Sequence, residues 1–127
     1  GIYYSDLGSA PRWTEVASWL ETMLSGTRVV VDNAAYDTGV VNAACRRYGQ
    51  ADLANAWECA MLRYAAFVGD PGRYGDYKWH RLEKAAAAFG IEPGGHRALE
   101  DAVACRNVVR AMASVQPGQY MGREIAD

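Results

Sequence analysis

The chain has 127 residues, of which half are hydrophobic and 22% are charged, so we expect one globular domain rather than a disordered segment. Its formal net charge of −2 excludes a global basic field of the kind that coats nucleic acid non-specifically. An enzyme stays possible, because a carboxylate-lined metal site keeps the charge balance acidic. No transmembrane-length window or signal-peptide pattern is present, so we expect no membrane partner.

The cysteines predict no metal site. Cys45, Cys59 and Cys105 are odd in number, widely spaced and embedded in apolar stretches. The absence of a C-x-x-C pair argues against zinc. We expect reduced, buried thiols in a reducing compartment, and therefore a cytoplasmic protein.

The first half of the chain predicts a helix, a strand and a second helix. Residues 10–26 carry an apolar stripe at helical spacing, and Ser9 is the expected cap. The run "RVVVD" (28–32) predicts a strand buried on both faces. Residues 34–48 predict a helix whose inward positions are Val40, Val41, Ala44, Cys45 and Tyr48.

The second half is mainly helical. "NAWEC" (55–59) is compatible with a short strand that leads into a helix over 60–69, and 70–77 form a Gly/Pro/Asp loop. Residues 78–90 predict a helix. Residues 96–115 predict the last helix, and 116–127 form a polar tail. The inward positions expected for the last helix are Ala98, Ala102, Cys105, Val109 and Met112.

This set of elements leaves the strand at 28–32 short of partners. One strong strand and one weak one cannot satisfy each other's backbone groups and cover both faces. Either the N-terminal "GIYY" adds a strand, or the chain pairs with a second copy, or an N-terminal segment of a longer parent completes the sheet.

Three residues suggest chemistry. Asp37 falls at the start of the helix that follows the strand, on the face that becomes apolar, although an acidic residue also suits a helix N-terminus through the dipole. Two glycines precede His96 and allow a close approach of that loop. Asp101 would point in from the second turn of the last helix, although H-x-x-x-x-D alone is a weak pattern.

Taken together, these motifs resemble the DEDDh family of 3′–5′ exonucleases, the DnaQ-like nucleases with an RNase H-like fold. Asn33 to Asp37 match the second motif, N-x-x-F-D, with Tyr36 in the aromatic place. His96 and Asp101 match the third motif, H-x-x-x-x-D. "RLEKAAAAFGI" resembles the segment before that motif, and "GIYYSDLGSAP" resembles the segment that leads into the first helix. The resemblance covers residues 1 to about 115.

The resemblance implies an α/β, three-layer fold, present here as its C-terminal portion with helices flanking a small sheet. It also implies two-metal hydrolysis of phosphodiester bonds. Asp37 and Asp101 would hold two Mg²⁺ or Mn²⁺ ions, which prefer oxygen ligands. His96 would be the general base, because its ordinary pKa lies near neutrality.

The first family motif, D-x-E, is missing. No Asp in the chain is followed two positions later by Glu, and the nearest candidate, Asp6, has Gly8 in the Glu place. With two carboxylates absent, we expect weak metal binding and inefficient turnover by this chain alone. The alternatives are a non-catalytic remnant that binds nucleic acid or a protein, and a helical scaffold whose motifs match by accident.

Several other side chains could contact a single-stranded DNA or RNA 3′ end; the sequence does not distinguish the two substrates. Tyr36 is the aromatic best placed to stack on the terminal nucleotide, and Asn33 could bond the substrate or cap the helix. His80, among basic residues, could touch phosphate, although a solvated helix face is the simpler interpretation. Trp13 is expected in the core and Trp19 off the apolar stripe.

Overall fold

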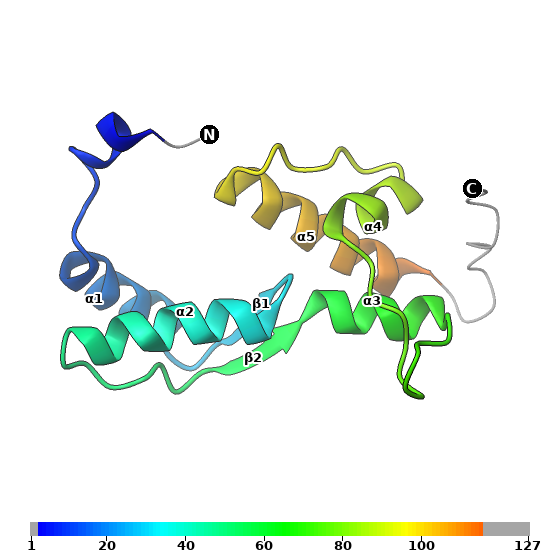
Figure 1. Ribbon diagram of the computed structural model, residues 1–127, viewed down its shortest axis with the longest axis horizontal. Coiled ribbons are helices and arrows are strands. Elements are labelled where there is room, and N and C mark those ends of the chain that lie inside the picture. The colour runs from blue at the N-terminus through cyan, green and yellow to red at the C-terminus, as the bar shows by residue number, and fades with distance from the viewer. Residues whose placement is uncertain (1–2, 116–127) are drawn as a thin grey trace. The chain divides into compact units, whose positions relative to one another are not determined.

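The computed structural model describes residues 3–115, which form two compact units (Figure 1). Unit 1 comprises residues up to 30 and residues 34–58. Unit 2 comprises residues 31–33 and the chain from residue 59 onward. The predicted polar tail, 116–127, lies outside the described residues. The mixed α/β composition expected from the sequence is confirmed.

Unit 1 contains most of the small sheet, whose strands end at Val31 and Cys59 in unit 2, and the helices that precede and follow the first strand. A 3-10 helix, η1 (Tyr4–Leu7), is followed by α1 (Trp13–Leu24) and β1 (Arg28–Val31). Helix α2 (Ala34–Arg47) and strand β2 (Ala56–Cys59) complete it. The strands pair in parallel, and α2 lies in the crossover connection that a parallel pair needs. Of the segment "GIYY", the structure describes Tyr3 and Tyr4. Neither lies in a strand, and Tyr4 begins η1.

The local details of unit 1 differ from expectation at two places. Helix α1 begins at Trp13, and its first turn is capped by Glu15, whose Oε2 accepts the backbone N–H of Arg12 at 2.8 Å, so Ser9 is not the cap. Ala17 on the expected stripe is buried, and Trp19 is 65% exposed. Trp13 is half-buried and donates from Nε1 to Gln50 Oε1 at 2.9 Å.

Strand β1 is not buried on both faces. Its residues alternate between exposed and half-buried, and Val30 is 43% exposed. Two positions expected to face inward from α2, Val40 and Tyr48, are each 53% exposed, whereas Cys45 is buried. The prediction of a strand buried on both faces is therefore wrong. Pairing with β2 satisfies one edge of β1 but covers neither of its faces.

Unit 2 holds the main core. Helices α3 (Ala60–Val68) and α4 (Leu82–Ala88) both pack against α5 (Ala98–Ser114). The buried centre consists of Tyr64, Ala85, Ala86 and Val108. The ring of Phe89 meets that of Tyr64 edge-on at 6.1 Å between centroids. Small alanines in α4 let the helices approach closely around these two aromatic rings.

Two helix predictions in unit 2 need correction. Residues 78–81 are not helical, so α4 begins four residues later than expected. In α5 the buried residues are Ala104, Cys105 and Val108, while Ala98 and Ala102 are exposed. Because α3 and α4 both pack on α5, its buried face is set by two neighbours rather than by the single stripe read from the sequence.

Two of the three cysteines are buried, as the sequence predicted. All three cysteines lie in the described part of the chain and form no disulfide; Cys45 and Cys105 are buried and Cys59 is half-buried. Over residues 3–115, no helix is both long and apolar enough to cross a membrane.

Candidate functional site

A surface pocket of unit 2 brings together the two residues of the H-x-x-x-x-D pattern. His96 and Asp101 both line it, and its volume is about 620 Å³. Asp101 lies in the first turn of α5, not the second, and His96 lies in the loop before that helix. The other lining residues are Asp32, Met61, Trp79, His80, Arg81, Leu82 and Glu83.

The loop before α5 holds His96 in a strained backbone conformation. His96 has a φ of 58°, the one non-glycine residue with positive φ among residues 3–115. Left-handed backbone is unfavourable for a residue with a Cβ and is concentrated at functional sites. Histidine is among the non-glycine residues that adopt this conformation most readily, so the cost of the turn at His96 is modest.

The glycines before His96 explain how the loop reaches the helix. A Cβ on Gly94 would meet the Oδ1 of Asp101 and would lie 2.7 Å from the backbone N of that residue. The N–H of Gly95 donates to Glu100 Oε2 at 3.0 Å, which ties the loop to the first turn of α5. The two glycines therefore allow His96 and Asp101 to occupy the same pocket.

Glu83 is the neighbour of the His96 ring. The Nδ1 of His96 lies 3.7 Å from Oε1 of Glu83, in the first turn of α4, and the two side chains are 83% and 42% exposed. This distance is too long for a hydrogen bond, so the carboxylate can act on the imidazole only by charge. Nε2 takes no part in this contact. No sequence pattern singled out Glu83.

Asp32 is a second pocket residue that sequence reasoning missed. It follows β1, and its backbone oxygen accepts the N–H of Met61 at 3.0 Å and the Sγ–H of Cys59 at 3.1 Å. These bonds fix the end of the strand at the start of α3. A carboxylate directly after a strand, at the sheet edge where parallel α/β proteins bind ligands, was the available signal.

His80 is buried, which corrects the prediction of a solvated basic face. The residue is 7% exposed, and its Nε2 lies 3.6 Å from Oδ2 of Asp70. Its ring packs edge-on against Tyr64 at 5.7 Å. Burial, together with the charges of Lys84 and Lys78, lowers the pKa of His80 despite the opposing effect of Asp70. His80 therefore anchors its segment to α3 and is disfavoured as a phosphate-binding cation.

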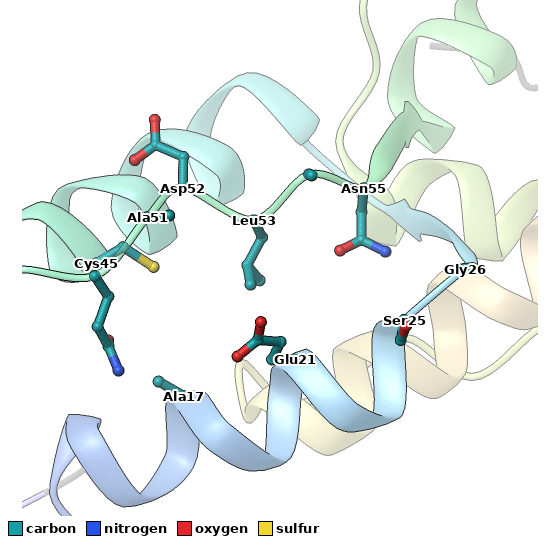
Figure 2. Close-up of a pocket in the computed structure, with 11 residues that line it drawn as sticks. Ala17, Glu21, Ser25, Gly26, Cys45, Ala51, Asp52, Leu53 and Asn55 are labelled. Atoms are coloured by element: carbon teal, nitrogen blue, oxygen red, sulfur yellow. The ribbon is translucent and has the colours of Figure 1, made fainter.

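A second pocket, in unit 1, lacks comparable chemistry. Its volume is about 510 Å³, and it lies between α1 and the segment 50–55. Figure 2 shows Leu53 and Glu21 pointing toward each other, whereas the carboxylate of Asp52 points away. Asp52 is paired with Arg46 at 3.1 Å. No histidine lines this pocket, so the candidate site is the one in unit 2.

Comparisons with known proteins identify the family of the chain. A family model described as an exonuclease matches residues 1–109. The chain belongs to the RNase T exonuclease family. It is 34% identical over 112 residues to an uncharacterized exonuclease, CP81, of Escherichia phage 186. That match covers 82% of this chain and 58% of the phage protein, so the chain spans little more than half of its relative. No solved structure matches the chain.

The other expected site residues of this exonuclease domain lie at the start of α2. Asp37 is half-buried in its first turn, and Tyr36 beside it is 68% exposed. Asn33 is half-buried and directly follows Asp32. Asp37 belongs to unit 1 and Asp101 to unit 2, so their convergence stays a prediction.

The donor set of the pocket suits a divalent cation only in part. Asp32, Glu83 and Asp101 supply the hard oxygen ligands that Mg²⁺ and Mn²⁺ prefer. However, within residues 3–115 no three His, Cys, Asp or Glu side chains are grouped closely enough to hold a metal ion. The pocket can therefore contribute ligands to a metal site without completing one.

Proposed function

We propose that this exonuclease-family protein is a metal-dependent 3′–5′ exonuclease acting on single-stranded DNA or RNA. The observation that carries the proposal is the shared pocket of His96 and Asp101, built by a strained loop within a matched exonuclease domain. A carboxylate that can hold a metal ion and an exposed imidazole that can accept a proton are groups that metal-dependent phosphodiester hydrolysis uses.

His96 would act as the general base. It would accept a proton from the attacking water at Nε2, while the charge of Glu83 near Nδ1 keeps the ring oriented. Asn33 and Tyr36 would contact the 3′-terminal nucleotide, the aromatic ring by stacking on its base. The high exposure of Tyr36 leaves its ring accessible for that contact.

Asp37 and Asp101 would serve as ligands of two Mg²⁺ or Mn²⁺ ions. When bound, such ions activate the attacking water and stabilise the leaving 3′ oxygen. We expect two further carboxylates, because no Asp in the chain has a Glu two positions later. An upstream segment of the protein or a partner chain could supply them, and we expect the complete enzyme to work in the cytoplasm.

The test measures release of mononucleotides from a 3′-labelled single strand, using protein expressed from its whole reading frame. We expect release in Mg²⁺, loss in EDTA, and a loss of roughly a hundredfold or more in Asp101→Asn. Asp52→Asn is the matched control, because Asp52 is exposed and lies in unit 1. Equal activity of Asp101→Asn and Asp52→Asn would refute the assigned role.

The second candidate function is a binding protein without catalytic activity. Two observations favour it: the chain has no D-x-E motif, and within residues 3–115 no set of side chains is complete enough to hold a metal ion. This candidate function predicts that the protein expressed from its whole reading frame binds oligonucleotides but does not hydrolyse them. Mg²⁺-dependent mononucleotide release that depends on Asp101 would exclude it.

A further inference from the structure

The segment between α3 and α4 exposes three aromatic side chains. We name residues 70–79, "DPGRYGDYKW", the 70–79 loop; it projects from the end of α3 in Figure 1. Tyr74 is 86% exposed, Tyr77 50% and Trp79 59%. Exposed aromatic rings do not contribute their apolar surface to the core. A group of them on one surface loop therefore indicates a binding surface.

Backbone bonds give the 70–79 loop a defined shape. Lys78 N–H donates to the oxygen of Asp70 at 2.9 Å, and Gly72 N–H donates to the oxygen of Asp76 at 2.7 Å. A Cβ on Gly72 would lie 2.9 Å from that same oxygen, so only glycine fits this close approach. These bonds close the loop in the manner of a hairpin and hold the backbone that carries the aromatic side chains.

The base of the loop is fixed to the core of unit 2. His80, the residue after Trp79, is buried against Tyr64 of α3, and its Nε2 lies 3.6 Å from Oδ2 of Asp70. Both ends of the loop are thus attached to α3. A surface held in this way loses little conformational entropy on binding.

Cationic side chains alternate with the exposed rings. Arg73 and Lys78 lie within the loop, Arg81 follows it, and all three are exposed. The guanidinium of Arg73 lies 5.9 Å from the centre of the Tyr74 ring, within the range of a cation–π contact. The loop also carries Asp70 and Asp76, so its own charges balance, and it is the Arg73 guanidinium beside an exposed aromatic ring that favours an anionic, base-bearing ligand over an apolar one.

The loop is continuous with the candidate site. Trp79 lines both the pocket of His96 and Asp101 and a second hollow of about 370 Å³ along the loop. That hollow is bounded by Arg73, Tyr74 and Tyr77, among others. A ligand that entered the site from this side would pass the two tyrosines and then Trp79.

We propose that the 70–79 loop is a binding platform for single-stranded nucleic acid, on which the nucleotides that precede the 3′-terminal one stack. Tyr74 and Tyr77 would stack on bases, and Arg73 would pair with backbone phosphate. This inference rests on the proposed exonuclease function, because it takes the terminal nucleotide to lie beside His96 and Asp101.

Fluorescence anisotropy of 5′-labelled (dT)₁₀ and (U)₁₀ in EDTA tests the platform without hydrolysis. Stacking on one ring predicts that Tyr74→Ala weakens binding roughly fivefold to a hundredfold, and that Tyr74→Phe restores it. Tyr4→Ala is the matched control, because Tyr4 is 92% exposed in unit 1. Arg73→Gln should lower the slope of log affinity against log salt by about 0.7.

The outcomes separate this proposal from the proposed function. Affinity of Tyr74→Ala equal to that of Tyr4→Ala would overturn the platform even if the protein releases mononucleotides in Mg²⁺. Undetectable binding of both oligonucleotides by the unaltered protein would overturn it as well. A selective loss in Tyr74→Ala supports the platform whether or not hydrolysis is seen, whereas failure of the exonuclease role appears only in the hydrolysis assay.

Discussion

Gly94→Ala should damage both the fold and the proposed activity. Its added Cβ would lie 2.7 Å from the backbone N and 2.8 Å from the Cα of Asp101, whereas ordinary contacts begin at 3.4 Å. The loop or the first turn of α5 must then move by about 0.7 Å, and overpacking of this kind costs roughly 1–3 kcal/mol. Because the contact is with Asp101 itself and His96 lies two residues after Gly94, a displacement of this order should reduce hydrolysis by roughly a hundredfold.

Urea unfolding followed by circular dichroism, together with the hydrolysis assay, measures both effects. Gly95→Ala is the milder comparison and should cost less, because its Cβ would meet only the flexible end of Glu100, which can move while it still accepts the N–H of residue 95. Gly39→Ala, in open space within α2, should stabilise the protein by roughly 0.5–1 kcal/mol. If Gly94→Ala unfolds at the same urea concentration as Gly95→Ala and keeps full activity, the close approach of the loop to α5 is wrong.

Three further changes test other parts of the structure. His96→Ala should lower hydrolysis roughly 10²–10⁴-fold with an unchanged urea midpoint, because the side chain is 83% exposed; a large loss of stability would point to a structural role instead. Burial lowers the pKa of His80, so the unfolded chain binds its proton more readily, and the free energy of unfolding should fall as the pH drops below about 6.5. His80→Phe should flatten that dependence in urea titrations across pH, and an unchanged slope would assign it to other groups. Trp13→Phe should lower the free energy of unfolding by about 1 kcal/mol, because it removes the hydrogen bond to Gln50. Trp19→Phe should lower it by less than about 0.5 kcal/mol, because Trp19 is exposed, and equal losses in the two variants would contradict the hydrogen bond.

The sequence predicted the helices and strands better than their buried faces. Stripes and turn residues placed both strands and all the α-helices of residues 3–115 nearly correctly, because these signals act over a few residues. The exposure of Val30 and Val40, and the rotation of the buried face of α5 toward Val108, depend on which elements pack together. That information is not contained in a single helix or strand.

For the candidate site, the motif predicted the meeting of His96 with Asp101 but not their neighbours. H-x-x-x-x-D fixes a short stretch of chain, and the two glycines before it let the loop fold back on α5. Glu83 and Asp32 come from α4 and from the end of β1, so only tertiary structure brings them to the same pocket. His80 was expected on a solvated face, yet its segment is non-helical and turns the ring inward against α3.

The most direct test of the proposed mechanism is the location of a bound cation. Crystals of the protein from its whole reading frame, soaked in Mn²⁺ and measured at the manganese absorption edge, would give anomalous peaks at each metal position. The two-metal mechanism predicts peaks that contact the carboxylates of both Asp37 and Asp101, with His96 beside them. Peaks away from Asp101, or carboxylates of Asp37 and Asp101 that share no ion, would contradict it.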